Sequence, residues 1–292
     1  MSVAAIDIGT NSVRLLIAQQ EGKQLKRLAS KLETPRLGAG ICQNDYLNQD
    51  AIERTIEVLK GYQKIVEQFD ASSYVVATSA VRDATNQQEF LQQVKEETGF
   101  EIKVVSGEEE ARLSYLGITS SITHLEEQVL AVDIGGGSTE FIYGVKDELE
   151  EYTSINLGAV RLTEKYDDDF DKINLVAEKM IKEAIDNKDC VQLLGVGGTV
   201  TTLVAIELEL EPYNRKKVDG YFLTKSSIER IFNKLSCLSL AERKKIIGLQ
   251  PKRADIILAG IIILLKIMEE TNLEQIQVSE AGILEGIIQK HI

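Results

Sequence analysis

The feature that most constrains this chain is a short phrase of sequence that occurs twice, at Asp7–Ser12 and at Asp133–Thr139. Each copy begins Asp-Ile-Gly, follows a short apolar run and continues into a second β-prone run. A strand, a Gly/Ser/Thr turn and another strand form a hairpin whose backbone N–H groups can point at an anion. The acidic residue at each turn can hold a metal ion or orient a water. The repeat therefore predicts two similar halves that face a phosphate.

The second copy carries three consecutive glycines, Gly135–Gly137. An ordinary hairpin needs fewer, so the run favours close approach of the backbone to a bulky anion. A third glycine turn, Gly195–Thr202, follows a predicted strand and opens a predicted helix, which offers free N–H groups and the positive end of a helix dipole. Any one of these turns alone is compatible with an ordinary tight turn. Three in one chain favour phosphate binding.

The order of predicted elements also repeats. Three strands and two helix–strand units occupy the first half, and the pattern restarts between residues 120 and 127. We therefore expect an α/β protein with one domain at 1–124 and another at 125–292, whose closing helix, 281–292, can pack back on the first domain. In the second half the first expected helix is Asn174–Asn187. The apolar helix 254–270 contains Gly260, which predicts close approach to a neighbour.

Bulk properties exclude several classes of function. The formal net charge of −13 repels nucleic acid and anionic membranes, so neither is an expected partner. The longest apolar stretch, 256–265, is too short to span a bilayer. Cys42, Cys190 and Cys237 are odd in number and far apart, which predicts reduced thiols and a cytoplasmic location. With two histidines, a zinc site is not expected.

Candidate catalytic groups follow two predicted strands. In Ser106–Arg112, Ser106 is a predicted N-cap and Glu109 completes a capping box, but one of Glu108, Glu109 and Glu110 can instead be a general base. Spacing alone does not choose among them. Arg82 is either a surface residue or a phosphate ligand at a strand's carboxyl end. Arg14 likewise points either outward or toward the ligand.

Five segments, taken together and in order, resemble the exopolyphosphatase / guanosine pentaphosphate phosphohydrolase family of the actin–Hsp70–sugar-kinase superfamily. They are Asp7–Arg14, Ala77–Ala84, Ser106–Leu113, Asp133–Glu140 and Gly197–Thr199. The resemblance covers almost the whole chain and is closest to the short form of the family. It implies two RNase-H-like α/β domains with an active-site cleft between them.

The resemblance implies Mg²⁺-assisted hydrolysis of the terminal phosphoanhydride of inorganic polyphosphate, or alternatively of guanosine pentaphosphate (pppGpp) or a nucleoside triphosphate. By motif position Glu110 matches the catalytic base, Arg82 a residue that binds the phosphoryl group, and Asp133 and Glu140 the acids that support metal and water. A homodimer is implied by the family only. The expected phosphate-binding positions are Asp7, Gly9, Thr10, Asn11, Ser12, Arg14, Gly135, Gly136, Gly137, Ser138, Thr139, Gly197, Gly198 and Thr199.

Near the end of the chain the sequence departs from the family, because Ala281 and Leu284 replace a glycine and an arginine of its C-terminal motif.

A polyanionic substrate also needs cations. Seven basic residues of this chain either line a groove that follows the polyphosphate chain or are ordinary solvated surface residues. The rival functions are a sugar or acetate kinase on the same scaffold and a nucleotide-gated binding protein. The candidate groove residues are Arg36, Arg161, Arg215, Lys216, Lys217, Lys252 and Arg253.

Overall fold

The computed structural model describes the chain except residues 1, 22–23, 42–44, 123–124, 146–147 and 186–189. The chain folds into two units, each with its own sheet. The first comprises residues 1–120 and 283–292, and the second comprises residues 121–282. Cys42 and His124 lie outside the described residues. No helix of the described part is long and apolar enough to cross a membrane.

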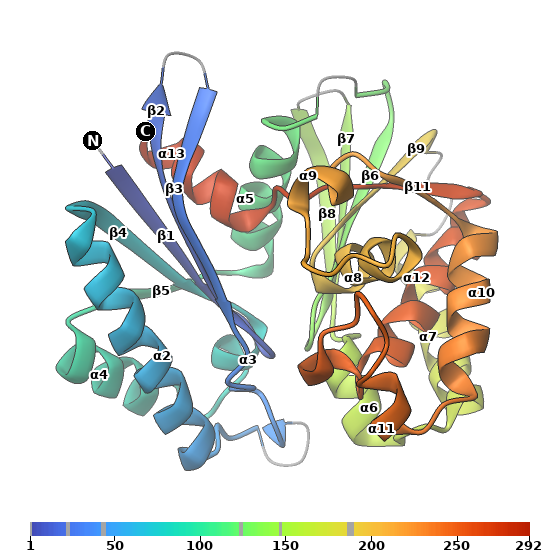
Figure 1. The fold of residues 1–292 in the computed structure, drawn as a ribbon, viewed down its shortest axis with the longest axis horizontal. Helices are drawn as coiled ribbons and strands as arrows, with labels where there is room; N and C mark the ends of the chain where they lie inside the picture. The colour runs from blue at the N-terminus through green and yellow to red at the C-terminus, as the bar shows by residue number, and fades with distance from the viewer. Residues whose placement is uncertain (1, 22–23, 42–44, 123–124, 146–147, 186–189) are drawn as a thin grey trace. The chain divides into compact units, whose positions relative to one another are not determined.

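The first unit is a five-stranded mixed sheet with helices on both faces (Figure 1). The strand order is β3-β2-β1-β4-β5, antiparallel through β1, β2 and β3 and parallel from β1 to β4 and β5. Its strands are β1 Ser2–Ile8, β2 Val13–Glu21, β3 Gln24–Glu33, β4 Ala71–Ala77 and β5 Ile102–Val104. Its helices are α2 Gln49–Gln68, α3 Ser79–Arg82, α4 Gln87–Thr98, α5 Gly107–Thr119 and α13 Ile283–His291.

Strand β1 is buried on both faces because its side chains alternate between two cores. Ala4, Ile6 and Ile8 join the apolar cluster formed with α2 and α4. Val3 and Ala5 join the smaller cluster formed with α5 and α13. Figure 1 shows α2 and α4 on one face of this sheet, and α5 and α13 on the other. The helix at the chain's end thus packs directly against α5.

The second unit is built on a six-stranded sheet of order β10-β11-β9-β6-β7-β8, in which β6, β9 and β11 are parallel. Its strands are β6 Val129–Ile134, β7 Thr139–Val145, β8 Glu148–Ile155, β9 Gln192–Val196, β10 Phe222–Thr224 and β11 Gln275–Val278. Its helices are α6 Ala159–Tyr166, α7 Phe170–Ile185, α8 Gly198–Glu207, α9 Arg215–Val218, α10 Lys225–Ser236, α11 Leu240–Arg243 and α12 Ile257–Thr271, with a 3-10 turn, η1, at Pro251–Arg253.

One large apolar cluster fills the second unit, and α12 lies at its centre against α7 and α10 (Figure 1). Ten of the fifteen residues of α12 are buried, as its nearly all-apolar sequence predicts. Gly260 makes the expected close approach, because a Cβ atom there would lie 2.7 Å from Oγ1 of Thr199. Helix α12 therefore packs directly against the third glycine turn.

The structure confirms the predicted α/β class and the repeated order of elements. Several of the boundaries predicted from the sequence are wrong. The helix expected at 174–187 begins earlier, at Phe170, and α6 and β10 were not expected at all. Helix α6 has eight residues and β10 has three, so both are shorter than the stretch over which a hydrophobic period is usually counted. The missed α6 matters because it contacts the triple-glycine turn.

Candidate active site

The two Asp-Ile-Gly phrases form turns with the same backbone geometry. In the first unit the Gly9 N–H donates to the Ser12 carbonyl at 3.0 Å, and in the second the Gly135 N–H donates to the Ser138 carbonyl at 2.9 Å. The flanking strands pair in the same register, Ile8 with Val13 and Ile134 with Thr139. Each turn therefore joins its two strands through four residues.

The residue opposite each aspartate differs between the two turns. Asp7 pairs across the strands with Arg14, which donates from Nη2 at 2.6 Å and from Nε at 3.0 Å to one carboxylate oxygen. The side chain of Asp7 is only 5% exposed. Asp133 instead pairs with Glu140, so two carboxylates occupy adjacent positions of β6 and β7. Arg14 is thus bound to Asp7 in this structure.

Polar groups of the first turn are buried and held by neighbouring loops. The Thr10 hydroxyl lies 2.9 Å from that of Ser79 at the start of α3. The carbonyl of Thr10 accepts a hydrogen bond from the Gly38 N–H at 2.9 Å. Asn11 Oδ1 is buried with no hydrogen-bond partner among the residues that the structure describes. A buried amide oxygen of this kind is costly and marks a position where a ligand donor would fit.

Helix α3 also places Arg82, and α5 places Glu110. The Nη1 atom of Arg82 donates to Oε2 of Glu110 at 3.1 Å and to the Val105 carbonyl at 3.1 Å. The side chains of Arg82 and Glu110 are 24% and 12% exposed. Since Ser79 of the same short helix contacts Thr10, α3 connects the first turn with the Arg82–Glu110 pair.

The structure separates the three glutamates that sequence spacing left open. Glu108 is exposed and pairs with Arg112 one turn along the helix at 2.9 Å. Glu109 pairs with Lys103 at 2.5 Å, and the hydrogen bond from that ammonium lowers the pKa of the Glu109 carboxyl. Ser106 caps the helix as expected, accepting from the Glu109 N–H, but the Glu109 side chain bonds lysines and leaves the capping box half formed. Glu110 alone of the three contacts Arg82.

The triple-glycine turn packs against the start of α6. The N–H groups of Ala159, Val160 and Arg161 donate to the carbonyls of Gly135 and Gly136 at 2.9–3.0 Å. The Nε atom of Arg161 donates to the Gly137 carbonyl at 2.9 Å.

Thr139 does not present its hydroxyl to this turn. It is fully buried and donates to the Leu157 carbonyl at 2.5 Å. The Thr139 hydroxyl is therefore engaged by the segment before α6.

The third turn lies beside Asp133. Gly197 has φ of +86°, and a Cβ atom there would lie 2.4 Å from Oδ1 of Asp133, so only glycine fits. A Cβ atom on Gly198 would lie 1.6 Å from Nη1 of Arg253. The carboxylate and a guanidinium therefore both lie against the start of α8. Of the candidate groove residues, Arg253 lies beside Gly198 of the third glycine turn.

Asp133 and Glu140 are the carboxylates of this unit that could hold a metal ion. They come from adjacent strands at facing positions, and Glu140 accepts a hydrogen bond from the Ser154 hydroxyl at 2.9 Å. Within the described residues there is no cluster of three or more His, Cys, Asp or Glu suited to a metal. Two carboxylates fit Mg²⁺, which proteins often bind through one or two acids together with substrate phosphates and water.

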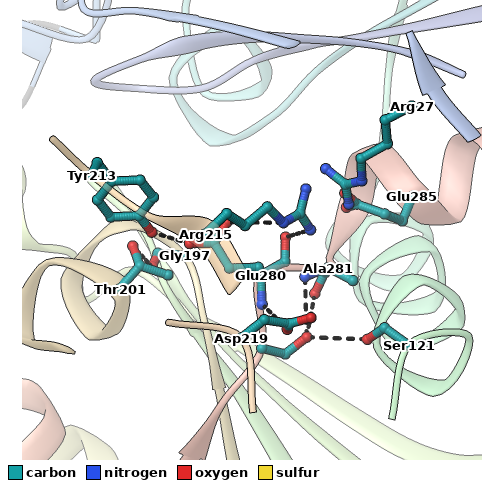
Figure 2. Close-up of polar contacts among 11 residues, drawn as sticks. Arg27, Ser121, Gly197, Thr201, Tyr213, Arg215, Asp219, Glu280, Ala281 and Glu285 are labelled. Carbon is teal, nitrogen blue, oxygen red and sulfur yellow. Dashed lines mark hydrogen bonds and ion pairs between the residues drawn. The ribbon is translucent and has the colours of Figure 1, made fainter. Parts of the chain in front are cut away.

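The C-terminal motif that departs from the family is tied into the second unit by Glu280. Figure 2 shows Tyr213, Arg215 and Asp219 around it. The Tyr213 hydroxyl donates to its carboxylate, Arg215 Nη2 donates to its carbonyl at 2.7 Å, and its N–H donates to Asp219 Oδ1 at 2.9 Å. Arg215 is therefore engaged by Glu280.

The two substituted positions have packing roles. Ala281 is buried, and its N–H donates to the Ser279 hydroxyl at 3.1 Å. Leu284 belongs to the apolar cluster of α5 and α13, where a charged arginine would lose hydration. Glu285, one residue on, is buried and forms an ion pair with Arg27 of the same unit.

Comparisons with known proteins agree with the motifs. A model of the Ppx/GppA phosphatase family matches residues 16–292. The bifunctional 3-dehydroquinate synthase/phosphatase of Fusobacterium nucleatum is 36% identical over 312 residues, which cover 98% of this chain and 47% of that protein. The chain thus spans about half the length of this curated relative.

Solved structures extend the match. The Aquifex aeolicus member of the Ppx/GppA family is 36% identical with a TM-score of 0.85, covering 100% of this chain and 97% of that one. An exopolyphosphatase from Cytophaga hutchinsonii is 26% identical with a TM-score of 0.92 and the same coverage. The agreement of motifs, sheet topology and whole-chain similarity has one explanation: the chain belongs to the Ppx/GppA phosphatase family.

Proposed function

We propose that this chain is an exopolyphosphatase that removes the terminal phosphate of inorganic polyphosphate with the help of Mg²⁺. The observation that carries the proposal is the Arg82–Glu110 pair, connected through α3 to the Asp7 turn. A largely buried carboxylate beside a phosphate-binding cation is suited to orient and deprotonate a water. The Cytophaga hutchinsonii relative, described as an exopolyphosphatase, supports the choice of substrate.

The chemistry needs no covalent nucleophile. A water held by Glu110 attacks the terminal phosphorus and passes a proton to the carboxylate, while the bond from that phosphorus to the bridging oxygen breaks and the shortened chain leaves with its electron pair. The transition state for phosphoryl transfer gains mainly from positioning and charge neutralisation. Arg82, which lies beside Glu110, provides positive charge for this step.

Asp133 and Glu140 would hold the Mg²⁺. When bound, the ion neutralises phosphate charge and orients the terminal group. The glycine turns beside these acids would bind the same phosphate oxygens through N–H groups. Acids, amides and guanidinium groups of this unit thus have complementary tasks: the acids bind the cation, and the other groups bind the anion.

The direct test measures orthophosphate release from long polyphosphate, pppGpp and ATP with Mg²⁺, in the wild-type chain and in Glu110→Gln. A general base contributes roughly 10²- to 10⁴-fold, so we expect kcat to fall by at least about 100-fold. The matched control is Glu108→Gln, on the same helix but exposed and paired with Arg112, with kcat within about twofold of wild type. Full activity in Glu110→Gln would refute the assignment of the base.

The substrate comparison decides between the remaining functions. Faster turnover of pppGpp or ATP than of polyphosphate would replace the proposed substrate with a nucleotide and keep the mechanism. ADP formation that depends on an added sugar or acetate acceptor would instead indicate a kinase. Binding of nucleotide without turnover of any substrate would indicate a nucleotide-gated binding protein.

A further inference from the structure

All three carbonyls of the triple-glycine turn point toward one segment, Leu157–Arg161. Gly135 and Gly136 accept hydrogen bonds from three backbone N–H groups at the start of α6, at 2.9–3.0 Å. Gly137 accepts its bond from the Nε atom of Arg161 at 2.9 Å. The last of the three carbonyls is therefore held by a side chain, whereas the first two are held by backbone.

This arrangement fixes the direction of the amides. In a trans peptide the C=O of one residue and the N–H of the next point opposite ways. The N–H groups of Gly136, Gly137 and Ser138 therefore point away from α6. In the part of the chain that the structure describes, none of these three donates to another residue. Three such amides form a concavity suited to a phosphate oxygen.

Two further contacts hold the Leu157–Arg161 segment against the turn. The buried Thr139 hydroxyl donates to the Leu157 carbonyl at 2.5 Å. A Cβ atom on Gly158 would lie 2.4 Å from the Gly136 carbonyl oxygen, so the two backbones touch. A glycine peptide can flip easily because glycine tolerates positive and negative φ alike. Tethering each carbonyl removes that freedom.

We propose that Arg161 is a positioning residue, which holds the Gly137–Ser138 peptide so that the Ser138 N–H points at the phosphate being transferred. The inference rests on the proposed function. It replaces the expectation that Arg161 lines a groove for the polyphosphate chain. The two roles differ in kinetics: a groove cation lowers KM more for long chains than for short ones, whereas an oriented amide raises kcat for every chain length.

The test compares Arg161→Met with wild type, using long polyphosphate and tripolyphosphate. Removing one oxyanion donor typically costs about 10²- to 10³-fold, and a loosened one should cost less, so we expect kcat to fall roughly 10- to 100-fold on both substrates. The affinity for orthophosphate, measured by calorimetry, should fall as well. In Arg161→Ala, added guanidinium should restore part of kcat. Lys165→Met is the matched control, because it removes one exposed cation from the same helix.

The outcomes separate the inference from the proposed function. No orthophosphate release by wild-type protein from any substrate would defeat the proposed function. Release by wild type with an unchanged kcat in Arg161→Met would overturn the inference alone. A rise in KM confined to long polyphosphate would also overturn it, in favour of the groove. If Arg161→Met does not fold, Gly158→Ala tests the same turn, and an unchanged kcat and orthophosphate affinity there would count against the inference.

Discussion

The Asp7 turn and the Asp133 turn have the same backbone geometry but differ in the charge of the residue that faces the aspartate. Both close with a hydrogen bond from glycine N–H to serine carbonyl, and both present an aspartate at the last but one residue of the strand before the turn. Across the strands, Asp7 faces Arg14, whereas Asp133 faces Glu140. The residue that faces the aspartate is thus a cation in the first turn and a second acid in the other.

The acids of the first unit that lie near its turn and α5 each have a cationic partner. Asp7 binds Arg14, Glu110 binds Arg82, and Glu109 binds Lys103. Like charges at facing positions of two strands are unfavourable, which makes the Asp133–Glu140 pair suited to an added cation. This difference supports the proposal that Mg²⁺ binds at Asp133 and Glu140.

The largest expected effect comes from removing one acid of the second unit. In Asp133→Asn we expect kcat to fall by at least about 100-fold and the Mg²⁺ concentration for half-maximal rate to rise, because metal and oriented charge contribute several kcal/mol. Steady-state assays over a Mg²⁺ titration measure both. If the rate of this variant depends on Mg²⁺ concentration as in the wild type, Asp133 does not bind the metal. The proposed difference between the two turns would then be wrong.

A change at the equivalent position of the first unit should act on stability. Asp7→Asn removes the carboxylate that Arg14 binds, and since Asp7 is buried but Arg14 is 31% exposed, we expect unfolding to become easier by about 2 kcal/mol. Urea denaturation measures this. The double variant Asp7→Asn/Arg14→Met should recover part of the stability lost in Asp7→Asn. It removes the Arg14 cation as well as the Asp7 carboxylate, so no unpaired charge is left. If the two losses simply add, the pair is not coupled.

Much of this site is readable from the sequence because its groups lie in contiguous phrases. The glycine turns, Arg82 and the helix start at Ser106 follow local patterns whose structure depends on neighbouring residues. Pairing is different. The family resemblance favours Glu110, but the fold alone shows that Lys103 and Lys290 engage Glu109, because Lys290 is 181 positions away from it. No local pattern reports such a contact.

The contact of Arg161 with the triple-glycine turn could not be predicted from the sequence for a related reason. Helix α6 is short, and its backbone N–H groups donate to glycine carbonyls 24 or 25 residues earlier in the chain. The available signal was Gly158 before the amphipathic run Ala159–Tyr166, a pattern typical of a helix start that touches another backbone. From the sequence alone, a basic residue in such a helix is expected to be a surface residue. Only the fold shows that the Gly137 carbonyl lies within its reach.

The smallest expected effect is on stability, from a change at Glu109, the neighbour of the proposed base Glu110. The Lys103 hydrogen bond lowers the pKa of Glu109 in the folded chain, so this pair contributes stability above the unfolded pKa of about 4.5 and loses it as pH falls through the lower folded value. Glu109→Gln should therefore lower stability at pH 7 by no more than about 0.5 kcal/mol, because the pair is partly exposed. The difference from wild type should shrink below pH 4.5. Thermal melts at pH 7 and pH 3.5 measure it, and orthophosphate release should stay close to wild type. A large loss of turnover would place Glu109, rather than Glu110 alone, in the site.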